Sequence, residues 1–157
     1  MREMATSSEH ETRALGEKIA SLVRPGDVIL LIGELGTGKT VLAKGIAQGL
    51  GIKEKVLSPT FTILKEYAGK IPLYHLDAYR LDGPRDLQDL GLEEYLEGGV
   101  LLVEWGDRVC RYFTADYLEI RIDWGGPESA RRIALVSESE TWRRRLDTLD
   151  LGGDLID

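Results

Sequence analysis

The sequence has little of what secreted, membrane or zinc proteins need. It has one cysteine, Cys110, which cannot form a disulfide within the chain, and two histidines without metal-ligand spacing. No apolar run is long enough to span a bilayer, and Met1–Thr6 lacks the apolar core of a signal peptide. These absences argue against a disulfide scaffold and a zinc site. We expect a protein of the reducing cytoplasm with no membrane contact.

Positive charge is also scarce, since 20 Lys and Arg residues stand against 27 Asp and Glu and give a net charge of −7. This balance argues against a protein that holds nucleic acid by itself through neutralising its phosphates, but it does not exclude a role beside a basic partner. Basic residues gather at Arg143–Arg145, and every charged residue after them is acidic. This ending is either a solvated helix end with an acidic tail or an electrostatic contact for a protein partner.

Two nucleotide-binding signatures are missing as well. The chain has no Asn-Lys-x-Asp motif, which argues against a GTPase of the signalling type, and nothing in it resembles the signature of a transporter ATPase. With 157 residues and a hydrophobic fraction of 43%, it is long enough for one domain with a real core and too short for two. We therefore expect a single domain over residues 1–157.

What the sequence does contain is a phosphate-loop motif at residues 33–40. The segment Gly33-Glu34-Leu35-Gly36-Thr37-Gly38-Lys39-Thr40 matches the Walker A pattern G-x-x-x-x-G-K-[ST]. The apolar run Val28–Ile32 leads into it, and the amphipathic stretch Val41–Leu50 follows it. A strand, a glycine loop and a helix in this order are what phosphate binding requires. The alternative is a glycine-rich turn that binds no ligand.

Each residue type in this loop has a chemical reason. Gly33, Gly36 and Gly38 allow positive φ and a close approach of the backbone to an anion. The loop amides and the positive end of the following helix can then surround a polyphosphate. Lys39 would reach the β- and γ-phosphates, and the Thr40 hydroxyl would bind Mg²⁺. The motif therefore predicts a purine nucleotide bound with Mg²⁺.

Mg²⁺ and an attacking water also need carboxylates near the γ-phosphate. Glu104 follows four apolar residues, in the pattern of a buried strand that ends in an acid, and Asp77 ends a similar but less apolar strand. A carboxylate in such a place is costly to bury unless it meets a cation or a donor. The alternative for each is an ion pair with an arginine, and Arg80 is close to Asp77 in sequence.

Three further residues have both a functional and a structural interpretation. Thr60 follows a Ser-Pro pair, so it is either a switch element that closes over the γ-phosphate and Mg²⁺ or a β-forming residue of an edge strand. Trp105 is either part of the core or a sensor beside the nucleotide. His75 is typical of a packed strand residue rather than of a general base.

Apolar periodicity and turn signals predict the order of the elements. Helices are expected over Glu9–Val23, Val41–Leu50, Pro84–Leu96 with an interruption at Gly91, and Thr141–Leu149. Strands are expected over Val28–Ile32, Ser58–Leu64, Tyr74–Tyr79, Val100–Glu104, Tyr117–Ile122 and Arg132–Val136. We expect an α/β, P-loop NTPase-like fold, with a mixed, mostly parallel sheet flanked by helices and an antiparallel C-terminal hairpin. Its core spans about residues 10–137, and a helix and acidic tail follow over 138–157.

Four segments in this order resemble a known family. They are the phosphate loop at 33–40, Ser58-Pro59-Thr60-Phe61-Thr62, His75-Leu76-Asp77-Ala78-Tyr79-Arg80-Leu81 and Leu102-Val103-Glu104-Trp105. Together they resemble the TsaE (YjeE) family of small bacterial P-loop ATPases, over about residues 10–137. The phosphate loop is shared with many proteins, whereas the other three segments in combination are far more specific.

The resemblance implies a biological role. The family supports synthesis of threonylcarbamoyladenosine, the modified base beside the anticodon of tRNAs that read codons beginning with adenine. Its members act with a TsaD–TsaB pair, in which TsaD carries the transfer chemistry, and they hydrolyse ATP at the interface of that pair and reset the complex. We accordingly expect ATP or ADP with Mg²⁺ and contact with tRNA only through the complex. Because the sequence offers a phosphate cradle and carboxylates but no obvious arginine finger in a fixed place, we also expect weak hydrolysis by the chain alone and stimulation by the partners.

The resemblance also implies roles for particular residues, carried over by position. Thr40 and Glu104 would organise Mg²⁺, and Thr60 and Asp77 would lie on the γ-phosphate side and help to position water, so that Asp77, Glu104 and Thr60 form the catalytic set. The expected nucleotide-binding residues are Glu34, Leu35, Gly36, Thr37, Gly38, Lys39, Thr40 and Trp105.

Two other classes of function use the same loop. A small-molecule kinase would transfer the γ-phosphate to an acceptor and would need an arginine-rich lid, for which Arg131-Arg132 and Arg143–Arg145 could be recruited. A non-catalytic, nucleotide-gated binding module would bind ATP without needing Asp77 or Glu104. Phosphate release to water without an acceptor distinguishes the ATPase from both.

Overall fold

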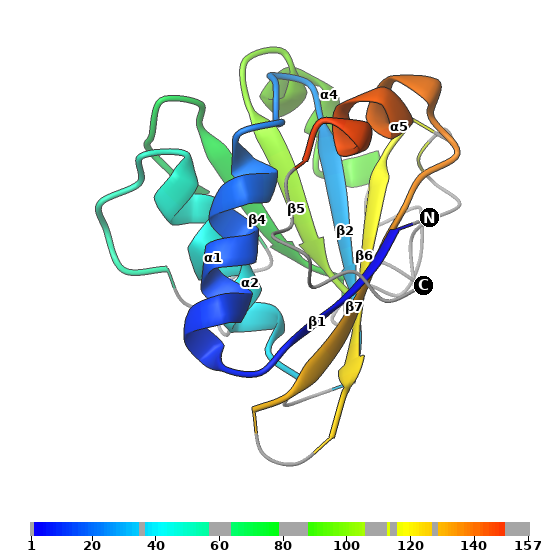
Figure 1. The fold of residues 1–157 in the computed structure, drawn as a ribbon. Helices are drawn as coiled ribbons and strands as arrows, with labels where there is room; N and C mark the ends of the chain where they lie inside the picture. Colours follow the sequence, from blue (N-terminus) through cyan, green and yellow to red (C-terminus); the bar gives the residue numbers. More distant parts are fainter. Residues whose placement is uncertain are drawn as a thin grey trace.

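The computed structural model describes residues 2–34, 37–56, 64–78, 88–105, 113, 116–126 and 129–149. Within these ranges the chain forms a seven-stranded sheet with helices on both faces (Figure 1). The strands are β1 (Arg2–Thr6), β2 (Val28–Ile32), β3 (Leu64–Tyr67), β4 (Leu73–Asp77), β5 (Val100–Glu104), β6 (Leu118–Trp124) and β7 (Arg131–Val136). The helices are α1 (Glu9–Ala20), α2 (Lys39–Gly49), α4 (Leu92–Leu96) and α5 (Glu140–Asp147). None of these helices is long and apolar enough to cross a membrane.

The strand order is β1-β7-β6-β2-β5-β4-β3, with β2 in the middle. The four central strands, β6, β2, β5 and β4, run parallel to one another, whereas β1, β7 and β3 pair antiparallel at the two sides. The predicted α/β fold with a mixed sheet and an antiparallel C-terminal hairpin, β6–β7, is confirmed. Three of the six pairings are parallel. Because the four central strands run parallel, their carboxyl ends lie at the same edge of the sheet.

Both faces of the sheet are covered, which explains the continuous apolar runs in its central strands. Ile29 and Leu31 of β2 face a core that includes residues of α1, α2 and α5, and Val28 and Leu30 face a second core that includes Leu92 of α4. Successive side chains of a strand alternate between faces, so a strand buried on both sides has no polar positions in its centre. The strands predicted over residues 28–32 and 100–104 are confirmed at both ends.

Several predicted helices and strands are present in the structure, but some of them begin or end at other residues than predicted. Ser8 is the N-cap of α1, and its hydroxyl accepts a hydrogen bond of 3.1 Å from the Glu11 N–H. Gly91 has a φ of +63° directly before α4, which agrees with the interruption expected there. The strand expected over 58–64 reaches the described residues only at Leu64, where β3 begins. Residues 84–87 of the expected helix over 84–96 lie outside the described residues.

The first strand, β1, is not predicted from the sequence. It pairs antiparallel with β7 along its whole length, and this partner lies more than 120 positions away in the chain. The Arg2 guanidinium donates to the carbonyl of Leu146 and, at 3.3 Å, to that of Leu149. Met4, Trp142 and Leu146 join the larger hydrophobic core from outside residues 10–137. Residues near both ends of the described chain therefore contribute to this core.

Helices α1 and α2 pack so closely that their backbones touch through glycines. A Cβ on Gly45 would lie 2.1 Å from the Arg13 carbonyl oxygen. We expect Gly45→Ala to push the two helices apart and to lower the free energy of unfolding by about 1–3 kcal/mol, the usual result of overpacking. Urea unfolding measures this change. Gly98→Ala is the control, because a Cβ there meets nothing within 4 Å; an equal loss in both variants would contradict the prediction.

Candidate phosphate-binding site

The phosphate loop lies at the edge of the sheet where the central parallel strands end. β2 finishes at Ile32, and α2 begins at Lys39, so the loop joins the middle strand to a helix packed on one face. In open α/β sheets, ligands bind in the crevice outside the carboxyl ends of the strands. The predicted strand–loop–helix arrangement is confirmed, although Leu35 and Gly36 lie outside the described residues.

Two glycines of the loop are required by its geometry. Gly38 has a φ of +104°, in the left-handed region that residues with a Cβ rarely adopt. A Cβ on Gly33 would lie 2.6 Å from the Ile122 carbonyl oxygen, so the loop can pass β6 only because this side chain is missing. Gly33 and Gly38 therefore allow the backbone path that the loop follows in the described residues.

The N-terminus of α2 is suited to an anion. Its N-cap is Gly38, which offers no side chain to accept from the first-turn N–H groups, and its first turn contains no acidic residue. The amide groups at a helix N-terminus carry the positive end of the helix dipole. Phosphate oxygens are well-suited acceptors for such groups.

Lys39, the first residue of α2, lies against the loop with its side chain largely buried. It is 5% exposed, and its Nζ donates a hydrogen bond of 2.7 Å to the Gly33 carbonyl. The same Nζ lies 3.5 Å from the centroid of the Trp105 ring. Trp105 is half-buried and has a φ of +61°, an unusual backbone conformation for a bulky residue. Trp105 packs against the second hydrophobic core and also contacts Lys39, so the structure agrees with a core role and with a position beside the phosphate loop.

The two predicted carboxylates lie on adjacent parallel strands. Asp77 of β4 is directly opposite Glu104 of β5, and Glu104 is in turn opposite Leu31 of β2. Residues in register on parallel strands share a face of the sheet, and Leu31 faces the core that contains α2. Asp77 and Glu104 therefore project toward the helix that begins with Lys39, as the strand-end argument predicts.

Glu104 has a partner that the sequence analysis does not pair with it. Its Oε2 lies 2.8 Å from Nε2 of His75, and both residues are buried. His75 is indeed a packed strand residue, as expected, and its buried ring also lies directly against the candidate metal-binding carboxylate. Because His75 is two residues before Asp77, it shares that face of β4; only the register of β4 on β5 identifies Glu104 as its neighbour.

A second contact that sequence reasoning misses joins the loop to the hairpin. Arg131 Nε donates to the Thr37 carbonyl, although the two residues are 94 positions apart. The sequence analysis considers Arg131 only for the lid of a kinase. In the structure it holds the phosphate loop instead, and the Thr37 hydroxyl donates a further bond of 2.7 Å to the Glu34 carbonyl. No local sequence signal identifies this contact, because Arg131 lies beside the loop only once the strands have assembled in their order in the sheet.

The structure also places three other predicted site residues. Glu34 is exposed, Thr37 is buried, and Thr40 follows Lys39 in the first turn of α2. Thr60 lies outside the described residues. Within those residues, no cluster of three or more His, Cys, Asp or Glu side chains could hold a metal ion.

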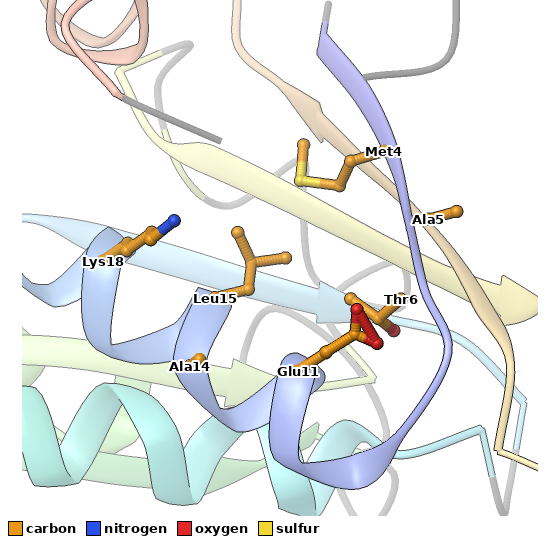
Figure 2. A pocket seen from close by; sticks show the side chains of 7 residues that line it. All are labelled: Met4, Ala5, Thr6, Glu11, Ala14, Leu15 and Lys18. Atoms are coloured by element: carbon orange, nitrogen blue, oxygen red, sulfur yellow. The ribbon is translucent and has the colours of Figure 1, made fainter. Parts of the chain in front are cut away.

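A hollow beside the first strand has no comparable chemistry. It has a volume of about 160 Å³ and lies between β1 and α1, lined by Met4, Ala5, Thr6, Glu11, Ala14, Leu15 and Lys18 (Figure 2). Hydrogen bonds from the Ser7 hydroxyl and N–H lower the pKa of the Glu11 carboxyl, which therefore serves the N-terminus of α1. The phosphate loop is the stronger candidate for the functional site.

A family model matches most of the chain. The family described as "Threonylcarbamoyl adenosine biosynthesis protein TsaE" matches residues 6–133. The matched segment contains the phosphate loop, Asp77 and Glu104, and it ends inside β7.

Similar proteins agree with the family model. The tRNA threonylcarbamoyladenosine biosynthesis protein TsaE of Bacillus subtilis is 46% identical over 125 residues, which cover 78% of each chain. The protein of the same name from Streptomyces coelicolor is 41% identical over 137 residues, 83% of this chain and 93% of that relative. The crystal structure of Bacillus subtilis YdiB superposes with a TM-score of 0.80 at 38% identity, covering 94% of this chain and 92% of the other.

Proposed function

We propose that this chain, which belongs to the TsaE family, binds and hydrolyses ATP with Mg²⁺ and thereby supports formation of threonylcarbamoyladenosine in tRNA. The observation that carries the ATP-binding part is the Lys39 ammonium, buried against a glycine loop on the sheet face that also bears Asp77 and Glu104. A cation, loop amides and strand-end carboxylates are the groups that a magnesium-bound triphosphate needs.

The residues present fit these ligands. The loop from Gly33 to Thr40 offers backbone amides, and the positive φ of Gly38 supports a loop conformation that residues with a Cβ disfavour. The hydroxyl of Thr40 and the carboxylate of Glu104 are hard oxygen donors of the kind that Mg²⁺ prefers. When bound, the ion would neutralise charge on the phosphates.

Each residue of the chain has a proposed task in turnover. Lys39 holds the β- and γ-phosphates, and its present acceptor, the neutral Gly33 carbonyl, is weaker than a phosphate oxygen. Glu104 holds the metal, and the buried His75 ring, 2.8 Å away, packs against that carboxylate. Asp77 and Thr60 orient the attacking water. Trp105 covers the Lys39 side chain and limits the access of bulk water to it.

We further propose that the chain works in the cytoplasm with a TsaD–TsaB complex and meets tRNA only through that complex. The net charge of −7 supports an indirect contact, since an acidic protein attracts nucleic acid poorly. The activity of the chain alone should be low. Arg131, an arginine that reaches the loop, donates to the Thr37 carbonyl and so is not aimed at a transferring phosphoryl group.

Phosphate release from ATP tests this proposal. We expect slow release by the isolated chain and release at least about tenfold faster with TsaD and TsaB, the direction expected if partners supply missing charge stabilisation. The matched control is Lys39→Ala with the same partners, which should show only background release. Equal rates with and without the partners would contradict the proposed stimulation. Transfer of labelled phosphate to a small acceptor would indicate a kinase instead.

A further inference from the structure

An exposed tryptophan lies at the end of β6, beyond the last residue of its neighbour β2. The β2–β6 pairing stops at Ile32 and Arg121, so Ile122, Asp123 and Trp124 continue past the end of β2. Trp124 is 50% exposed, the one large hydrophobic side chain that is exposed in the described part of the chain. An exposed indole offers a flat apolar surface on which another planar group can stack.

This extension of β6 runs along the phosphate loop. The carbonyl oxygen and Cγ2 of Ile122 would lie 2.6 and 2.7 Å from a Cβ on Gly33, so strand and loop are in contact. Side chains at 120, 122 and 124 share one face, and Ile120 and Ile122 belong to the core that contains α2. Trp124 therefore projects on the face where the loop and the start of α2 lie.

Arg131 connects the tryptophan to the loop. Its guanidinium carbon lies 4.3 Å from the centroid of the Trp124 ring, while its Nε donates to the Thr37 carbonyl. Its Nη1 donates a bond of 2.8 Å to the Ala130 carbonyl. A guanidinium held by backbone acceptors keeps a fixed orientation against the ring. Indole, guanidinium and loop backbone thus form one connected surface.

The position of the carboxylates gives a bound nucleotide a direction. Glu104 belongs to β5 on one side of β2, and Trp124 belongs to β6 on the other side. A triphosphate in the loop that places its γ end toward Glu104 directs its nucleoside end toward β6. The Trp124–Arg131 pair is then on the path of the base.

We propose that Trp124 and Arg131 form the stacking platform for the purine base of the bound nucleoside triphosphate. This inference rests on the proposed function, because it names the base subsite of the same phosphate site. Aromatic and guanidinium planes stack on any base and select poorly among them. The platform therefore adds affinity for the nucleoside without distinguishing adenine from guanine.

Binding of Mg·ATP and of inorganic tripolyphosphate to the full-length chain, measured by calorimetry, tests the platform. Trp124→Ala should weaken ATP binding about tenfold, the usual scale of base–aromatic stacking, and leave tripolyphosphate binding unchanged. Trp124→Phe should keep most of the ATP affinity. Asp123→Asn is the neighbouring control, since the side chain at 123 projects from the opposite face of the strand.

The possible results distinguish a failure of the base platform from a failure of the proposed phosphate site. If Trp124→Ala binds ATP as tightly as the parent, or loses ATP and tripolyphosphate affinity equally, stacking on the base is wrong. If the parent binds neither ligand, or Lys39→Ala binds both normally, the proposed phosphate site fails and the platform with it. Thermal melts of the Trp124 variants establish that they fold before binding is compared.

Discussion

Lys39→Ala is expected to lower the affinity for Mg·ATP on the order of a hundredfold, because a charged hydrogen-bond donor to the phosphates is lost. Lys39 is 5% exposed, and its Nζ is held by the Gly33 carbonyl and the Trp105 ring. A phosphate oxygen that takes over this donor replaces a neutral acceptor with a charged one. Calorimetric titration with Mg·ATP measures the loss.

Lys44→Ala is the matched control for this prediction. Lys44 is on the same helix and half-buried, but it lines a different hollow together with residues 13, 47–48 and 52–56. The change in charge is identical, so a general electrostatic effect would weaken binding in both variants. Retention of parental affinity by Lys39→Ala would show that the loop does not hold the triphosphate through this side chain.

Glu104→Gln is expected to reduce ATP hydrolysis about a hundredfold while leaving nucleotide bound, because a metal-binding carboxylate becomes a neutral amide of the same shape. Glu104 is 5% exposed and lies at the carboxyl end of β5, in register with Asp77. The amide binds Mg²⁺ more weakly, so the dependence of hydrolysis on Mg²⁺ concentration should shift to higher values. Single-turnover assays across a magnesium series measure both effects.

Glu119→Gln provides the comparison for Glu104. Glu119 lies near the amino end of β6, where its carboxylate pairs with Arg121 at 2.8 Å, away from the loop. This variant should hydrolyse ATP at the parental rate. A normal magnesium response in Glu104→Gln would assign the metal to another residue, and parallel thermal melts exclude loss of fold as the cause of a defect.

The buried centre of the fold could be predicted from the sequence, and its edges could not. β2 and β5 are continuous apolar runs because helices cover both faces, and the pattern alone gives their bounds. β1 is a short segment of mixed polarity that forms a strand because β7 lies beside it. Its pairing depends on residues more than 120 positions away, which no local pattern contains.

The candidate site shows the same division. The positions of Lys39, Asp77 and Glu104 in the fold could be predicted, because a motif or a strand end identifies each one in its own segment. The contact of His75 with Glu104 depends on the register between β4 and β5, and that of Arg131 with the loop depends on the strand order. Such contacts between segments are properties of the assembled sheet. The roles of Leu35, Gly36 and Thr60 stay predictions, since these residues lie outside the described ranges.

The central position of β2 has a consequence for synthesis of the chain on the ribosome. Residues 33–40 are made early, yet Gly33 rests against Ile122, and β2 needs β5 and β6 as neighbours. At roughly 5–20 residues per second, on the order of ten seconds separates the two segments. Until residues 100–104 are made, the apolar segment of β2 has neither of its two neighbouring strands. The nascent chain is thus most prone to aggregation before its last third emerges.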